Sequence, residues 1–232
     1  MPTKKISRKK LLKEPDEFIS TTAKTIQFFR TYQRQILRSA IIVLIVAVAA
    51  TGGFYYLRWQ EGKALAIQGE ALKFYQQAYA PGQENQGTDK KEEFKKALDK
   101  FREALSAYGW GRTAQISELY TGNCYFNMKE YEQAQAAYSR CLEGPFRPLA
   151  LNGLAYAFEA KGDYNKALEN FQKGNDARDN PFQLESMLGA ARSYEALNKK
   201  PKALEVYQKA LTQFPKSAKA EFIRWKVNEL KG

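Results

Sequence analysis

Histidine is missing from all 232 residues of this chain. Its absence excludes Ser-His-Asp and Cys-His nucleophilic systems, histidine-ligated haem and most zinc sites. The sequence also lacks the GxxxxGKS/T and GxGxxG patterns of phosphate-cradling loops. Carboxylates such as those of Glu92 and Glu93 lie in charged runs that are typical of a solvated surface. We therefore expect no catalytic, cofactor-binding or metal-binding residues, no cofactor and no enzymatic activity.

Cysteine is almost as scarce, because only Cys124 and Cys141 occur. In an oxidising compartment the two could form a disulfide, provided that their Cα atoms lie within about 7 Å of each other. Alternatively, both are reduced, and Cys141 acts as a small apolar side chain at a position that repeats along the chain. The sequence leaves both alternatives open.

Charge is missing from one stretch, Ala40–Leu57, which reads AIIVLIVAVAATGGFYYL. As a helix these eighteen residues span about 27 Å, enough to cross the core of a bilayer. The run is too long, and lies too far from Met1, for a cleaved signal peptide. We predict a transmembrane helix over residues 39–58, with an aromatic cluster that ends at Trp59 at one interface. A buried core helix is the alternative.

The positive charge of the chain is distributed unevenly. The net charge is +12, and residues 1–38 carry ten Lys and Arg against three Asp and Glu. Because basic flanks stay in the cytoplasm, we predict a cytoplasmic N-terminus and a periplasmic remainder. Residues 1–38 are predicted to form a basic arm with an amphipathic helix that contacts membrane lipid. This basic excess is a topology signal, so we expect no binding to nucleic acid.

One short phrase occurs four times after the apolar run. It consists of an alanine, an aromatic four residues later and a small residue three further on, a spacing that places all three on one helix face. The copies are Ala97/Phe101/Ala104, Ala134/Tyr138/Cys141, Ala167/Phe171/Gly174 and Ala203/Tyr207/Ala210. From alanine to alanine the intervals are 37, 33 and 36 residues. A period near 34 residues predicts an α-solenoid of stacked helix pairs.

The copies resemble tetratricopeptide repeats, in which a helix A with a small residue precedes a helix B with this phrase. The resemblance implies an all-α fold, in which a single transmembrane helix precedes about four helical hairpins and a capping helix. The predicted repeat domain covers residues 59–232, with repeats at about 61–110, 115–147, 148–183 and 184–216 and a capping helix at 217–230. Helix A of the first repeat is expected from Glu61 to Ala80, with Leu65, Gly69 and Leu72 on its packing face. In the capping helix, Phe222, Ile223, Val227 and Leu230 are expected to form one apolar stripe.

In tetratricopeptide domains the A helices line a concave groove that holds a peptide or a helix. By position, the resemblance assigns this groove to Ile116, Leu119, Asn123, Phe126, Asn127, Asn152, Tyr156, Glu159, Leu188, Arg192 and Glu195. The mixture of rings, amides and few charges suits an extended or partly unfolded polypeptide better than an acidic C-terminus. Each of these residues could instead pack against the capping helix or an adjacent repeat.

An anchor followed by divergent repeats resembles the YfgM-like family of single-pass ancillary proteins of the Sec translocon, whose repeat domains work with periplasmic chaperones. The resemblance implies an adaptor at the bacterial inner membrane that assists translocated polypeptides, with translocon or chaperone components as partners. The competing hypothesis is a structural accessory subunit of a stable envelope complex.

Overall fold

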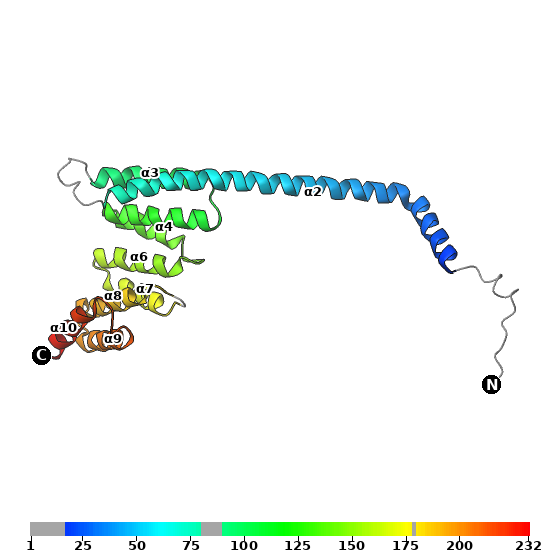
Figure 1. Ribbon diagram of the computed structural model, residues 1–232. Coiled ribbons are helices and arrows are strands. Elements are labelled where there is room, and N and C mark those ends of the chain that lie inside the picture. The colour runs from blue at the N-terminus through cyan, green and yellow to red at the C-terminus, as the bar shows by residue number, and fades with distance from the viewer. Residues whose placement is uncertain (1–16, 80–89, 178–179) are drawn as a thin grey trace, which may run out of the picture. The chain divides into compact units, whose positions relative to one another are not determined.

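The computed structural model describes residues 17–79, 90–177 and 180–232, with side chains from residue 22 onward. The start of the predicted basic arm, 1–16, and residues 80–89 and 178–179 lie outside the described residues. All regular secondary structure in the described ranges is helical (Figure 1). The predicted all-α fold is therefore confirmed there. The chain divides into two compact units, Met1–Arg58 and Trp59–Gly232.

The first unit contains most of the long helix α2, Glu17–Gln77. Part of this helix is long and apolar enough to cross a membrane, with a mean hydropathy of 2.2 over its most apolar window. None of that window is buried, whereas the core helix of a soluble protein would be mostly covered. The structure thus gives no support to the alternative of a buried core helix.

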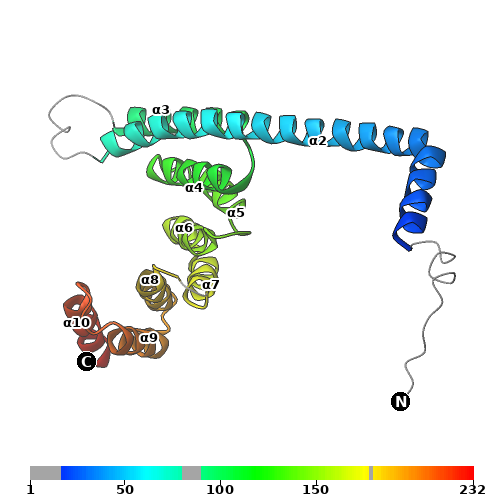
Figure 2. The same ribbon diagram turned by 45° about the vertical axis from the view of Figure 1, so that its right-hand side comes forward.

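The second unit is a stack of helical hairpins. Consecutive helices pack against one another, and α4 also contacts α6, which in turn contacts α8. Figure 2 shows the B helices α5 and α7 to the right of these three A helices, and α9 below α8. The bounds are α3 Lys90–Ala107, α4 Gly111–Asn127, α5 Tyr131–Ser139, α6 Arg147–Ala160, α7 Tyr164–Asn175, α8 Gln183–Ala196, α9 Lys200–Gln213 and α10 Ala220–Lys231.

The repeated phrase forms the core of this unit. Its four alanines and the rings of Phe101, Phe171 and Tyr207 have no exposed surface, and Tyr138 is 2% exposed. An alanine lets two helix backbones approach closely, and the ring then fills the space between neighbouring hairpins. The predicted packing role of the phrase is confirmed.

Glycines on the A helices receive these rings. A Cβ atom built on Gly153 of α6 would lie 2.6 Å from the ring of Tyr138, and one built on Gly189 of α8 would lie 2.4 Å from that of Phe171. At the first interface the neighbouring A helix offers Tyr120 instead, whose ring stacks on that of Phe101 with centroids 5.3 Å apart. Either a missing side chain or a stacked ring closes each interface.

Two elements differ from the sequence prediction. Helix A of the first repeat does not begin at Glu61, because α2 continues through it without a break. Its most buried residues are Ala64, Gln68 and Ala71. Of the residues predicted for the packing face, Leu72 is half-buried against the core, Gly69 is half-buried and Leu65 is 49% exposed. Gln68 on this face bonds to the backbone oxygen of Thr113 and to Ser117 in α4, and the small alanines beside it allow close helix packing.

The capping helix α10 begins at Ala220 and ends at Lys231. Ile223 and Val227 are buried against α9, and Leu230 packs partly onto the same cluster. Phe222 is 43% exposed and does not belong to the predicted stripe, because its side chain lies beside the exposed Trp225 instead.

Candidate protein-binding groove

A pocket of about 310 Å³ opens in the second unit. Residues from α2, α4, α5, α6 and the start of α8 contribute to it, so it spans the first three repeats and the entry to the fourth. It is lined by Tyr75, Tyr79, Leu119, Asn123, Phe126, Asn127, Tyr138, Leu149, Asn152, Gly153, Tyr156, Phe182 and Glu185. Six of the residues predicted for the groove thus line one pocket, namely Leu119, Asn123, Phe126, Asn127, Asn152 and Tyr156.

A chain of hydrogen bonds fixes the amides on one wall of the pocket. The Tyr138 hydroxyl donates to Oδ1 of Asn123 at 2.7 Å, and the Tyr79 hydroxyl donates to Oδ1 of Asn127 at 2.9 Å. Nδ2 of Asn127 donates to the backbone oxygen of Asn123 at 2.7 Å, one helical turn earlier. The carbonyl oxygens of both amides are thereby occupied, which orients their NH₂ groups.

Asn152 is held in the same way from the next repeat. The Ser186 hydroxyl donates to Oδ1 of Asn152 at 2.7 Å, and both side chains are buried. Within the described residues, Nδ2 of Asn152 and Nδ2 of Asn123 make no hydrogen bond. Two oriented amide donors on the pocket lining are therefore available to a ligand.

The pocket carries little charge. Burial raises the pKa of Tyr75, as does its contact with the Tyr79 hydroxyl, and burial likewise raises the pKa of Tyr138. Both phenols therefore stay neutral at physiological pH. The one carboxylate of the lining, Glu185, pairs with Lys219 at 3.0 Å. A neutral, ring-rich lining favours apolar side chains and uncharged backbone over charged ligands.

Five residues predicted for the groove lie outside this pocket. Arg192 donates from Nε and Nη2 to the two carboxylate oxygens of Glu159, at 2.9 and 3.0 Å. Glu195 accepts from the Tyr207 hydroxyl at 2.7 Å and from Nζ of Lys226 at 2.9 Å. The other two differ in burial, since Leu188 is buried in the core around Tyr207 and Ile116 is half-buried. Four of these five residues are therefore engaged within the chain, three of them in ion pairs and Leu188 in the core.

The sequence prediction omitted seven lining residues. Tyr75 lies in the last turn of α2 and Tyr79 two residues beyond its end, and their spacing of four residues is the signal that could have placed both on one side. Tyr138 was assigned to the core only, yet its hydroxyl reaches the lining. The remaining ones are Leu149, Gly153, Phe182 and Glu185, in the first two turns of α6 and at the start of α8.

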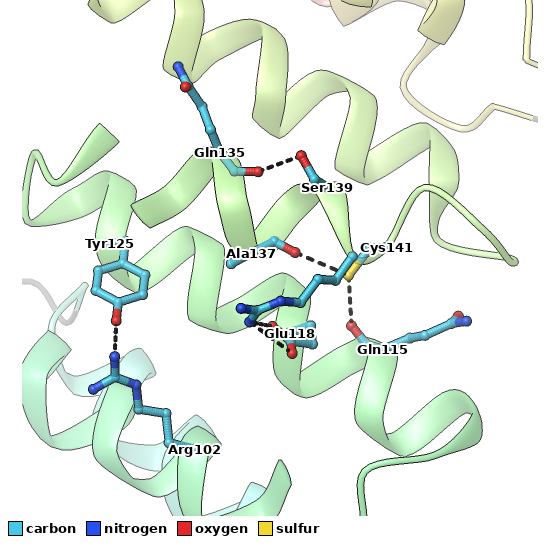
Figure 3. A network of polar contacts seen from close by, with 9 residues as sticks. Arg102, Gln115, Glu118, Tyr125, Gln135, Ala137, Ser139 and Cys141 are labelled. Atoms are coloured by element: carbon cyan, nitrogen blue, oxygen red, sulfur yellow. Dashed lines mark hydrogen bonds and ion pairs between the residues drawn. The ribbon is translucent and has the colours of Figure 1, made fainter. Parts of the chain in front are cut away.

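Of the two cysteines, Cys141 lies in a separate polar network, shown in Figure 3. Sγ of Cys141 donates to the backbone oxygen of Gln115 at 3.4 Å. Cys124 is nine residues further along α4, about 13 Å along the helix axis, which exceeds the reach of a disulfide. Burial raises the pKa of Cys124 to about 12 and that of Cys141 to about 11. Both are protonated, buried thiols.

Metal ligands do not gather in the part of the chain that the structure describes. No group of three or more Cys, Asp or Glu side chains there is placed to hold a metal ion.

The polar network of Figure 3 contains ion pairs and amide contacts between helices, such as Arg140 with Glu118 at 3.2 Å. These contacts stabilise the hairpin and leave the pocket between the A helices as the best candidate site.

Solved structures show the same fold at low sequence identity. The MamA RS-1 double mutant aligns with a TM-score of 0.54 and 16% identity, over 73% of this chain and 94% of that one. Nearly identical TPR-like repeats assigned to a Podosopora anserina kinesin light chain align with a TM-score of 0.52 and 14% identity, over 75% and 84%. A tetratricopeptide repeat protein from Parabacteroides merdae gives 0.52 and 16%, over 70% and 60%.

A search of functionally curated proteins found no match. The sequence pattern of one family, described as a tetratricopeptide repeat-like domain, matches residues 27–232. This range includes all the hairpins and most of α2. The chain therefore belongs to the tetratricopeptide repeat-like domain family.

Proposed function

We propose that this protein is a membrane-anchored adaptor that holds an extended segment of another polypeptide in the pocket between its A helices. The proposed anchor is Ala40–Leu57 in a bacterial inner membrane, with the N-terminus in the cytoplasm and the repeats in the periplasm. The family supports a scaffold that binds other proteins, and the unburied apolar helix and the basic N-terminal residues support the anchor. Assistance to translocated polypeptides is the role that fits this location.

The pairing of amides with rings in one pocket carries the proposal. An extended polypeptide presents backbone carbonyls between side chains that point in alternating directions. Nδ2 of Asn123 and Nδ2 of Asn152 can donate to such carbonyls, while Phe126 and Tyr156 accept apolar side chains. Because no unpaired charge is required of the ligand, the pocket suits many unfolded sequences.

Binding of a permanently unfolded polypeptide to the full-length chain in lipid nanodiscs tests the proposal. Asn123→Ala removes one amide donor, so we expect the dissociation constant to rise about fivefold, the equivalent of one hydrogen bond of about 1 kcal/mol. Asn165→Ala on the exposed surface of α7 is the matched control and should leave binding unchanged. Equal affinity of both variants would contradict the proposed site.

A structural subunit of a stable envelope complex is the second candidate. It is favoured by the exposed rings of Phe222 and Trp225 on α10, whose centroids lie 6.1 Å apart. Gentle detergent extraction of a tagged chain separates the two functions. A fixed complex at constant stoichiometry, together with no affinity for unfolded polypeptide, would favour the subunit over the adaptor.

A further inference from the structure

Trp110 lies in the turn between α3 and α4 and is 76% exposed. No other large hydrophobic side chain in the described ranges is more exposed, including those of the apolar run. Within those ranges its indole makes no hydrogen bond and no ring contact. Tryptophan prefers surroundings that cover its apolar ring and keep its N–H group in a polar layer. The exposed ring is therefore available to a partner that can cover it.

The turn that carries Trp110 is fixed to α2. Thr113 Oγ1, in the first turn of α4, donates to Oε1 of Glu61 at 3.3 Å. Nε2 of Gln68 donates to the backbone oxygen of Thr113 at 3.0 Å and to Oγ of Ser117 at 2.8 Å. Gln68 is only 5% exposed, so these bonds are shielded from water. The start of α4 therefore stays beside Glu61.

Glu61 follows the last residue of the apolar run, Leu57, by four positions. Even a fully extended chain of four residues reaches no further than about 14 Å. In a continuous helix, as α2 is, the separation is about 6 Å along the axis. The polar headgroup layer on each side of a bilayer is itself roughly 6 Å thick. Chain connectivity alone thus keeps the turn close to the membrane surface.

Basic side chains accompany the indole at this end of the hairpins. Arg112 is exposed, and its guanidinium carbon lies 5.6 Å from the centroid of the Phe146 ring. Arg147, at the start of α6, is also exposed. Nε2 of Gln115 donates to the backbone oxygen of Glu143 at 3.0 Å, which ties the α5–α6 turn to α4. Guanidinium groups bind phosphates well, and indoles settle at headgroup level.

We propose that the turn 108–112 is a second membrane contact of the protein. The inference rests on the membrane anchoring proposed above, and its partner is the headgroup layer of the same bilayer that holds Ala40–Leu57. Trp110 inserts its ring at the interface, and Arg112 lies on lipid phosphates. In this proposal the same layer also holds the aromatic side chains of α2 at the end of the apolar run and just after it, Phe54, Tyr55, Tyr56 and Trp59.

The three tryptophans of the chain allow a direct test by fluorescence. The full-length protein is reconstituted into vesicles with and without brominated lipid, which quenches indole fluorescence on contact. Pairs of Trp→Phe substitutions leave Trp59, Trp110 or Trp225 as the single fluorophore. We expect Trp110 to lose fluorescence to an extent comparable with Trp59, and Trp225 to keep its intensity. Circular dichroism confirms that each variant retains its helices.

Each other outcome has a distinct meaning. If Trp59 is not quenched, the anchoring itself fails. If Trp59 is quenched and Trp110 is not, the anchor stands and the second contact is refuted. If Trp225 is quenched as strongly as Trp110, the repeats adsorb without selectivity, which also overturns the assignment to this turn.

Discussion

Three glycines of the A helices are required by the rings that press on them. Gly122 and Gly153 lie on either side of the Tyr138 ring, where a Cβ atom would approach to 2.6 Å, and Gly189 faces Phe171. Because both rings are buried, neither can move away without disturbing its own hairpin. At these three positions only glycine, which has a hydrogen in place of a side chain, leaves room for the ring.

Gly189→Ala should therefore destabilise the protein even though alanine is the better helix former. The added methyl group would lie 2.4 Å from the Phe171 ring, and such overpacking costs about 1–3 kcal/mol of unfolding free energy. The matched control is Gly62→Ala, since no atom lies within 4 Å of a Cβ built there. That change should stabilise by up to about 1 kcal/mol. Denaturant unfolding followed by circular dichroism measures both, and a stabilising Gly189→Ala would contradict the packing described.

At the scale of the elements, the B helices were the most predictable part of the fold. The buried face of α7 consists of Ala167, Phe171 and Gly174, so the spacing of these three residues in the sequence is sufficient to orient the helix. Helix A of the first repeat was predictable only in part, because Leu72 packs against the core as expected whereas Leu65 is exposed. Ala64 and Ala71 share the most buried face with Gln68, which bonds to α4, and Leu65 lies outside that face.

The groove was predictable in part for a related reason. Position in a repeat identifies residues on the inner side of the A helices, such as Asn123 and Asn152, but it does not reveal which of them already have partners. Glu159 and Arg192 are 33 residues apart, and Glu195 and Lys226 are 31 apart. Opposite charges separated by one repeat length are a sequence signal that could have identified these pairs.

The Arg192–Glu159 pair is expected to stabilise the contact between α6 and α8 rather than to bind a partner. Arg192→Ala leaves the carboxylate of a partly buried Glu159 unpaired, which should cost about 1–2 kcal/mol of unfolding free energy. Arg224→Ala is the matched control, because both side chains of its ion pair with Glu221 are exposed, at 49% and 85%, and such a pair is worth less than about 1 kcal/mol. Chemical unfolding gives both values. Unfolded-polypeptide affinity should be the same in the two variants, and a selective loss in Arg192→Ala would return this residue to the binding surface.

At the scale of the whole molecule, the stability of each repeat depends on the repeats that pack against it. Among the described residues, each hairpin of the second unit contacts its immediate neighbours along the chain, so stability passes from repeat to repeat as in a one-dimensional array. Helix α10 covers the last hairpin, where Ile223 and Val227 complete a cluster with Tyr207 and Met187. Weaker packing of α10 should therefore lower the stability of the repeats nearest the C-terminus first.

Ile223→Ala tests this dependence. The side chain has no exposed surface, so its truncation should cost about 2–5 kcal/mol locally. In hydrogen exchange, the amides of α8 to α10 should exchange first, while those of α4 and α5 keep their protection because their own neighbours are unchanged. Phe222→Ala, one residue earlier and 43% exposed, should change stability by less than about 0.5 kcal/mol. Uniform loss of protection from α3 to α10 would mean instead that the hairpins unfold as one cooperative body.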